Sequence, residues 1–141
     1  MERLIQLKRK YDSMHAAHAR LEEAVELMKQ FNNPSQPMYE VVRDSAIKRF
    51  EFTIDPFWKF LKAYMSEVEG IVMEHPSPKM VYRQAEKVKI IALDEVELVM
   101  NMVDDRNIAA HDYDVFAIEH IKDKLPLYCK IIGNILERIK F

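Results

Sequence analysis

Apolar residues recur along most of this chain at alternating spacings of three and four positions. That period is expected of helices that bury one stripe of side chains. The first stripe consists of Leu4, Leu7, Tyr11, Met14, His18, Leu21, Val25 and Met28. Residues 31–37 contain two asparagines and two prolines, which favour a turn. We therefore predict a first helix that ends near residue 31.

A second stripe follows, in a segment that starts near Met38. It comprises Ile47, Phe50, Ile54, Phe57, Leu61, Tyr64 and Val68. Pro56 falls inside this segment, yet the stripe keeps its phase across the proline. A kinked but continuous helix is favoured, because a true break would usually shift the register. In the alternative, Asp55 caps a new helix whose first position is Pro56. Gly70 is expected to end the segment.

The second half of the chain contains signals for three more helices. Ser77 and Pro78 are a good N-cap and first-turn pair for a short helix. Asp94 and Glu97 then match a capping box, with Leu93 and Leu98 as a hydrophobic staple. The inward positions of the helix after that box would be Val96, Met100, Val103, Asn107 and Ala110.

The last helix is expected to start near Asp112 or Asp114 and to be kinked by Pro126. Its stripe consists of Ile118, Ile121, Leu125, Tyr128, Ile132, Ile135 and Ile139. Only 2 glycines and 6 prolines among 141 residues argue against a β-rich or disordered chain. We predict an all-α fold: an antiparallel up-and-down bundle of four long helices and one short helix, forming a single domain over residues 1–141.

Charge and cysteine content narrow the function classes. The formal net charge of -2 gives no global basic surface, which would be the usual footprint of a nucleic-acid binder. The local clusters at residues 8–10 and 48–49 are either basic patches or solvated helix faces. Cys129 has no second cysteine with which to pair. The first residues resemble no signal peptide and no apolar run is long enough for a bilayer, so we expect a cytoplasmic protein with no membrane partner.

Several kinds of site are excluded by the sequence. Two isolated glycines cannot build a phosphate-binding loop, and the Gly-Ser and paired-aspartate motif of a nucleotidyltransferase is missing. His15, His18 and Glu22 have spacings that could suit a metal ion, but His18 lies on the apolar stripe. A hydrogen-bonded core histidine is the favoured interpretation. We therefore predict no metal and no cofactor.

Residues 106–113 concentrate polar groups near the end of a predicted helix. Asn107 replaces an expected apolar residue and shares a face with His111, four positions later. Arg106 lies five positions before His111, which is roughly 140° around an ideal helix. The two converge only if the helix ends there or if the arginine side chain wraps round. From spacing alone, a structural role as caps and bridges between helices is the favoured interpretation.

The run Arg106-Asn107-Ile108-Ala109-Ala110-His111-Asp112-Tyr113 resembles the Arg-x4–6-His signature of HEPN proteins that partner minimal nucleotidyltransferases. The upstream residues 46–53 and 57–62 also look like the Arg-Phe-Glu-Phe-Thr and Trp-Lys helix of the nucleotidyltransferase substrate-binding branch. The similarity covers roughly residues 38 to 140, and its short motifs occur in the expected order. Pro56 departs from the family pattern.

The resemblance implies a helical bundle, commonly a homodimer, whose Arg/His motif faces a cleft between subunits. Its partner would be a minimal nucleotidyltransferase encoded nearby, in a toxin–antitoxin-like pair, with RNA or a nucleotide as candidate ligands. Many relatives are metal-independent RNA endonucleases. Carried over by position, the catalytic residues would be Arg106, Asn107 and His111, and Tyr113 would be the tyrosine that the transferase adenylylates.

The chemistry of such a site is reasonable. The imidazole of His111 could take a proton from a ribose hydroxyl, and the guanidinium of Arg106 could stabilise phosphorane charge. Glu51 could hold Arg106 in place, although it could equally lie at the surface. Three functions remain open: a non-catalytic partner subunit, a ribonuclease toxin inactivated by adenylylation of Tyr113, and a structural helical adaptor.

Overall fold

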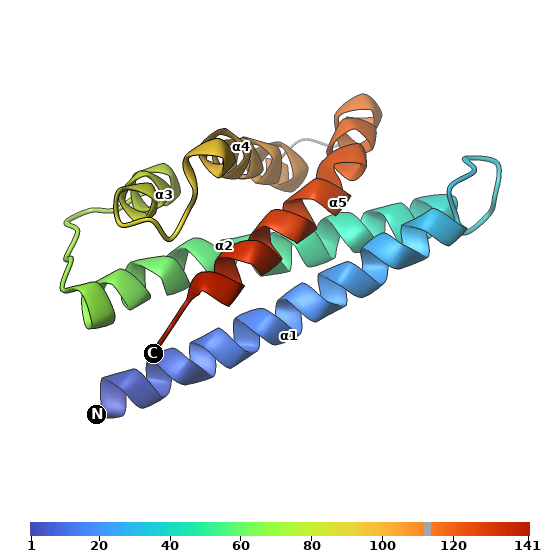
Figure 1. Ribbon diagram of the computed structural model, residues 1–141. Helices are drawn as coiled ribbons and strands as arrows, with labels where there is room; N and C mark the ends of the chain where they lie inside the picture. Colours follow the sequence, from blue (N-terminus) through green and yellow to red (C-terminus); the bar gives the residue numbers. More distant parts are fainter. Residues whose placement is uncertain (112–113) are drawn as a thin grey trace.

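Within residues 1–111 and 114–141, which the computed structural model describes, the chain forms five α-helices and no strand (Figure 1). They are α1 (Glu2–Gln30), α2 (Tyr39–Glu69), α3 (Pro78–Lys87), α4 (Val96–His111) and α5 (Val115–Arg138), with a 3-10 turn, η1 (Leu93–Glu95), directly before α4. The predicted all-α bundle of four long helices and one short helix is confirmed.

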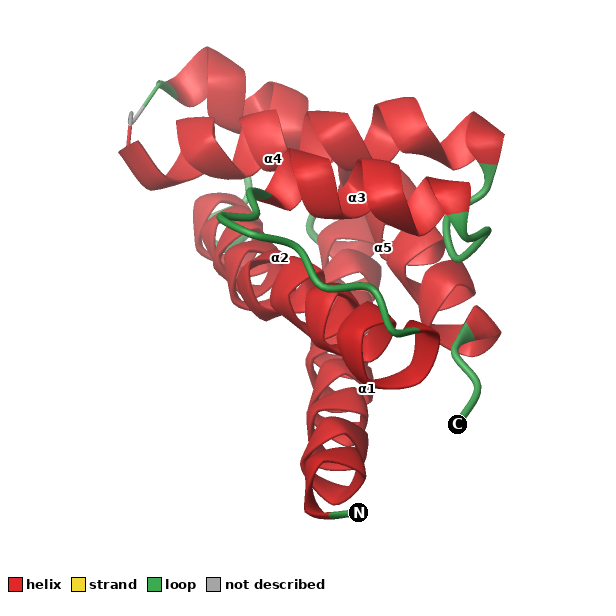
Figure 2. Ribbon diagram, turned by 90° about the vertical axis from the view of Figure 1, so that its left-hand side faces the viewer, coloured by secondary structure: helices red, strands yellow, loops and turns green. Residues whose placement is uncertain are grey.

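The helices are arranged in layers. Figure 1 shows α1 and α2 as a long antiparallel pair, and Figure 2 shows α3 and α4 running across that pair instead of along it. The helix α5 crosses α2 and also contacts α1 and α4. The helices α3 and α4 also contact α2, and the candidate site lies where these three helices meet.

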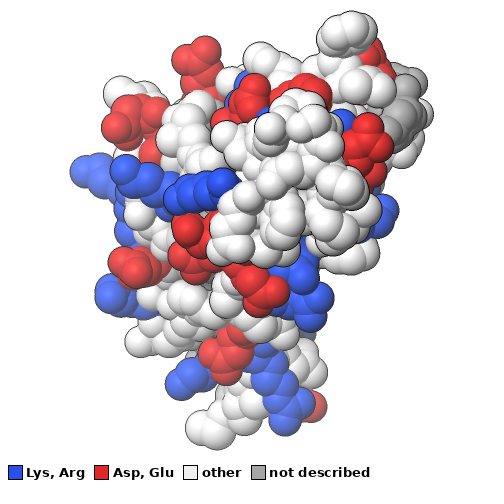
Figure 3. Space-filling view, turned by 90° about the vertical axis from the view of Figure 1, so that its right-hand side faces the viewer, with Lys and Arg blue, Asp and Glu red and all other residues white. Residues whose placement is uncertain are grey.

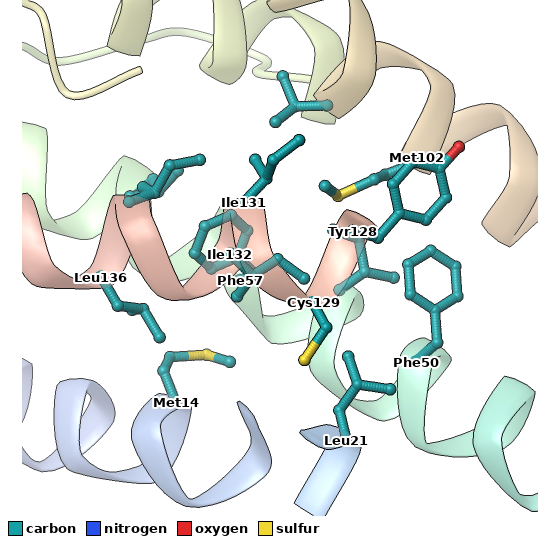
Figure 4. Packing of buried hydrophobic residues seen from close by; sticks show 14 of the residues in the cluster. Met14, Leu21, Phe50, Phe57, Met102, Tyr128, Cys129, Ile131, Ile132 and Leu136 are labelled. Carbon is teal, nitrogen blue, oxygen red and sulfur yellow. The ribbon is translucent and has the colours of Figure 1, made fainter. Parts of the chain in front are cut away.

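The core forms where α1, α2, α4 and α5 meet (Figure 4). The rings of Phe50 on α2 and Tyr128 on α5 stack with their centroids 5.6 Å apart. Phe57 on α2 and Ile132 on α5 are fully buried. Complete burial of an apolar side chain of this size contributes roughly 1.5–3 kcal/mol, so each of these residues contributes to the stability of the bundle.

Pro56 lies inside a continuous α2, so the prediction of one helix across the proline is confirmed. Proline has no N–H to donate to the carbonyl of Phe52, four residues earlier. Pro56 and Phe52 are both exposed, so water can satisfy that carbonyl. Packing of Ile54 and Phe57, both buried, holds the helix together on its other side.

The caps were predicted with mixed success. Ser77 accepts from the N–H of Met80, and Asp114 accepts from two N–H groups at the start of α5, as expected. The capping box at Asp94 and Glu97 was wrong. The carboxylate of Glu95 instead accepts from the N–H of Ala92, 2.9 Å away, because the chain makes a 3-10 turn before α4 starts.

The predicted stripe of α4 was only partly correct. Val96, Met100 and Val103 are partly buried and pack against the core, but Asn107 and Ala110 are exposed. The buried positions of α4 are Val99, Met102 and Asp105. Residues 96–103 carry apolar side chains on several faces, since α4 packs against α2, α3 and α5 together. A helix with several packing faces has no single stripe from which its inner face can be predicted.

Candidate functional site

The guanidinium of Arg106 on α4 is held by a carboxylate on α2. Its Nε donates to Oδ1 of Asp55 over 2.6 Å, and its Nη2 donates to Oδ2 over 3.1 Å. The hydrogen bond to Asp55 raises the pKa of Arg106, as does the negative charge of Asp55. Such a two-point contact fixes the plane of the guanidinium as well as its position.

The holding role suggested for Glu51 belongs to Asp55, one helical turn further along α2. Glu51 is buried, and its carboxylate lies 3.5 Å from the ammonium of Lys48. Its charge contributes to the raised pKa of Arg106, but the hydrogen bonds come from Asp55. Arg106 also reaches Oδ1 of Asn107 at 3.4 Å, which is a weak contact.

A cleft of about 290 Å³ opens beside this ion pair, between α2, the start of α3 and α4. We call it the α2–α4 cleft. One carboxylate and two cations line it, and the half-buried indole of Trp58 lies among them. The lining residues are Ile54, Asp55, Trp58, Lys59, Pro78, Tyr82, Val103, Arg106 and Asn107.

Tyr82 lines this cleft and has a buried hydroxyl group. Its side chain is fully buried, and its hydroxyl has no hydrogen-bond partner among the described residues. Burial raises the pKa of Tyr82, and the charge of Asp55 raises it further, so the hydroxyl stays protonated at neutral pH. A buried polar group without a partner costs free energy, which a ligand could recover by bonding to it.

The combination suits a small, flat, anionic ligand. Lys59 and Arg106 offer positive charge, Trp58 offers an aromatic surface, and the hydroxyl of Tyr82 can donate or accept. Two cations against the single carboxylate of Asp55 leave a net charge of one positive unit in the lining. The volume lies near the lower end of the usual range for ligand pockets, about 300–1,000 Å³.

The motif residues are only partly brought together within the described residues. Arg106 has its weak contact with Asn107, whereas the side chain of His111 forms no hydrogen bond to any described residue. Asn107 and His111 are both exposed on an unbroken α4. Arg106 turns toward Asp55 on α2. Tyr113, the expected modification site, lies outside the described residues, as does Asp112.

Four residues that give the cleft its chemistry were not found as site residues from the sequence: Asp55, Trp58, Lys59 and Tyr82. Asp55 was considered only as a helix cap beside Pro56, and Trp58 and Lys59 only as part of a family motif. A charged residue within an aromatic helix was the available signal for Asp55. No sequence signal marked the hydroxyl of Tyr82, because its position follows from how α3 crosses α2.

His18 on α1 has a structural role. The Nε2 of His18 lies 2.8 Å from the carbonyl oxygen of Cys129, and its Nδ1 faces Glu22 at 3.4 Å. His18 is thus the hydrogen-bonded core histidine that was favoured over a metal ligand. The described residues contain no group of three His, Cys, Asp or Glu side chains that could hold a metal ion.

Comparison with known proteins identifies the family of this chain. Residues 9–140 match the family described as nucleotidyltransferase substrate binding protein like. The chain belongs to this family. The match confirms the resemblance to the HEPN-type partner branch and extends it from residue 38 back into α1.

A solved structure is similar to this member of the nucleotidyltransferase substrate-binding family. It is a crystal structure of a protein from Thermus thermophilus, with 36% sequence identity and a TM-score of 0.69. The alignment covers 86% of this chain and 99% of the Thermus chain. No curated protein matches the sequence. No helix within the described ranges combines the length and apolar character that a membrane span requires.

Proposed function

We propose that this substrate-binding family member is the partner subunit of a minimal nucleotidyltransferase in a toxin–antitoxin-like pair. In this role it binds the transferase and presents a nucleotide or substrate in the α2–α4 cleft. The observation that carries the proposal is the fixed Arg106 guanidinium beside Trp58 and Lys59, in a chain of this family. A guanidinium held in one plane is well suited to bind phosphate.

The overall charge favours a small anionic ligand over a long nucleic acid. The net charge is -2, and on the face shown in Figure 3 basic and acidic side chains are interspersed. A protein that follows a nucleic-acid backbone normally needs a continuous basic surface. The cleft concentrates positive charge locally instead, at Lys59 and Arg106.

The partnership is tested by co-expression with a nucleotidyltransferase encoded beside the gene. The tagged chain is expected to purify with the transferase in a fixed ratio, and His111→Ala should leave this ratio unchanged. His111 is exposed on α4, so its truncation should not disturb the core. If no adjacent transferase binds the folded chain, the partner role is refuted.

The ligand is tested separately with the single tryptophan as the probe. Trp58 is the only tryptophan in the chain, so its fluorescence reports directly on the cleft. Titration with ATP, AMP or inorganic phosphate should change the emission, and Arg106→Ala should weaken binding at least tenfold. Arg83→Ala, an exposed arginine on α3 outside the cleft, is the matched control.

A ribonuclease remains the second candidate, because Asn107 and His111 lie exposed and four residues apart on one continuous helix. In this function a homodimer would combine two copies of His111, and adenylylation of Tyr113 would inactivate the site by adding a phosphate near it. It requires metal-independent cleavage of RNA that leaves cyclic phosphate ends and is abolished by His111→Ala. Intact RNA in the presence of a folded dimer would exclude this function.

If the chain is only a structural adaptor, replacing Arg106 and His111 lowers stability with no other effect.

A further inference from the structure

A second hollow lies between α1 and α2, next to the α2–α4 cleft. This groove, which we call the α1–α2 groove, has a volume of about 520 Å³. The buried side chains of Met14 and Phe60 form its floor, with Ala17 beside them. Phe52 lies at its edge and is 65% exposed, and Pro56 is also exposed.

The charged residues that line the groove are all basic. They are Arg9, Lys10 and Lys59, and each is exposed. No carboxylate of the described residues forms an ion pair with any of the three. Some other surface cations are paired, as Lys79 is with Asp104 at 2.8 Å, whereas Lys8, Lys62 and Lys87 form no ion pair within the described residues. The three cations of the groove are distinguished because they line one apolar surface together. A chain with a net charge of -2 therefore keeps three unpaired positive charges around one apolar groove.

The size of the groove limits what can fill it. Its lining spans residues 9–17 on α1 and residues 52–60 on α2. Eight residue steps of an α-helix cover about 12 Å, which is slightly more than two turns. A short amphipathic helix that places its apolar face in such a groove is a recurring mode of peptide recognition.

We propose that the α1–α2 groove is the docking site for an acidic, amphipathic helical segment of a partner protein. Apolar side chains of the segment contact Phe52 and Phe60, and its carboxylates pair with Arg9, Lys10 and Lys59. A single nucleic-acid strand would need several exposed aromatic faces on which to stack its bases. The groove offers one, Phe52, because Phe60 is buried in the floor.

The identification of this partner as the nucleotidyltransferase rests on the proposed function. The existence of the groove and its positive charge are independent of that function. Lys59 lines both the groove and the α2–α4 cleft. A partner docked on α1 and α2 would therefore lie directly beside the ligand. This arrangement would let the two proteins share one bound nucleotide or substrate.

The test uses a labelled synthetic peptide of about four helical turns, made of Leu, Ala and Glu with leucines at i, i+3, i+4 and i+7. Fluorescence anisotropy should show binding that weakens as salt increases, because screening reduces the attraction. Arg9→Glu with Lys10→Glu should reduce the affinity at least tenfold. The matched control is Lys87→Glu with Lys130→Glu, which makes the same charge change at exposed positions elsewhere.

The apolar part of the proposal has its own pair of variants. Phe52→Ser should weaken peptide binding, and Phe116→Ser should not, since Phe116 is 87% exposed on α5 away from the groove. The proposal is overturned if a peptide with every Glu replaced by Gln binds the wild-type protein as tightly as the original peptide does. It is also overturned if the Arg9→Glu, Lys10→Glu variant binds the original peptide as tightly as the wild-type protein does. So does an oligouridylate that binds the groove more tightly than the peptide. Arg106→Ala should leave peptide binding intact, which separates this test from that of the ligand site.

Discussion

Asp55 holds Arg106 across the junction of α2 and α4 through both of its carboxylate oxygens, 2.6 and 3.1 Å from the two guanidinium nitrogens. The pair is open to water, with 45% of the Asp55 side chain and 31% of the Arg106 side chain exposed. A pair this exposed contributes about 1 kcal/mol or less to stability. Its main effect is to fix the guanidinium beside the cleft and to neutralise part of its charge.

Asp55→Asn should therefore strengthen anion binding. The substitution removes the one negative charge of the α2–α4 cleft, so the net charge of its lining rises from one to two positive units. We expect the affinity for ATP to rise roughly threefold to tenfold, which corresponds to about 1 kcal/mol of electrostatic energy. Titration of Trp58 fluorescence at low salt measures this change. Weaker binding would show instead that Asp55 is needed to orient Arg106.

Tyr82→Phe should not destabilise the protein. The hydroxyl of Tyr82 is buried without a partner among the described residues, so its removal should leave the free energy of unfolding unchanged or raise it by about 1 kcal/mol. Binding of a ligand that uses the hydroxyl should become weaker at the same time. Thermal melts and Trp58 titrations measure the two effects.

Tyr128→Phe is the matched control for Tyr82→Phe. The hydroxyl of Tyr128 donates to Oδ2 of Asp105 over 2.5 Å, and Asp105 is buried. Removing that donor should lower the free energy of unfolding by about 1–3 kcal/mol. If Tyr82→Phe is equally destabilising, the hydroxyl of Tyr82 has a hydrogen-bond partner in the folded protein, and the prediction for Tyr82→Phe is wrong.

The sequence was sufficient to predict α2, whose apolar stripe keeps its register along the helix although α2 contacts α1, α3, α4 and α5. In α2 the stripe predicted a continuous helix through Pro56, because Ile54 and Phe57 keep the same face buried on both sides of the proline. The Arg106 to His111 segment was likewise found from its polar residues. Family resemblance then assigned functional roles that the spacing of these residues could not.

The sequence was insufficient to predict side-chain contacts where helices cross. Asn107 was expected to point inward, but α4 packs on three helices, and its inner face follows Val99 and Met102. The pairing of Arg106 with Asp55 joins residues 51 positions apart. It depends on the angle between two layers, which local periodicity does not contain.

Gly133→Ala should disturb the contact between α5 and α1. A β-carbon at position 133 would lie 2.9 Å from two atoms of the His18 ring, which is too close for carbon. The ring cannot move away freely, because its Nε2 lies 2.8 Å from the carbonyl oxygen of Cys129. We expect a loss of about 1–3 kcal/mol in the free energy of unfolding. Urea denaturation measures it.

The double variant with His18→Ala provides the control for that clash. Truncating the imidazole opens space beside position 133, so Gly133→Ala should be neutral or stabilising in this background, as alanine favours a helix interior over glycine by about 1 kcal/mol. The coupling between the two positions should therefore be large. Additive effects would show that the ring of His18 is not what Gly133 accommodates.

Glu95→Gln should change how stability depends on pH. Burial tends to raise the pKa of Glu95, but hydrogen bonds from Arg138 and from the N–H of Ala92, with the charge of Arg138, outweigh it and lower the pKa. The Nη1 and Nη2 of Arg138 donate to Oε1 and Oε2 of Glu95 over 2.5 and 2.9 Å, and these bonds link η1, directly before α4, to the end of α5. A carboxylate with a lowered pKa in the folded state stabilises the protein fully above its ordinary value of about 4.3.

That contribution is lost as the pH falls through the lowered pKa, because the folded state must then take up a proton that the unfolded state has already bound. At pH 7 we expect Glu95→Gln to cost about 1–2 kcal/mol, since a charged hydrogen-bond acceptor becomes neutral while Arg138 remains. The difference between wild type and variant should shrink between about pH 5 and pH 3 in urea denaturation curves. Glu97→Gln, at an exposed position two residues later, is the matched control and should give only a small difference at pH 7. If the Glu95→Gln difference stays constant as the pH falls, the pair with Arg138 does not lower the pKa of Glu95 enough to matter for folding.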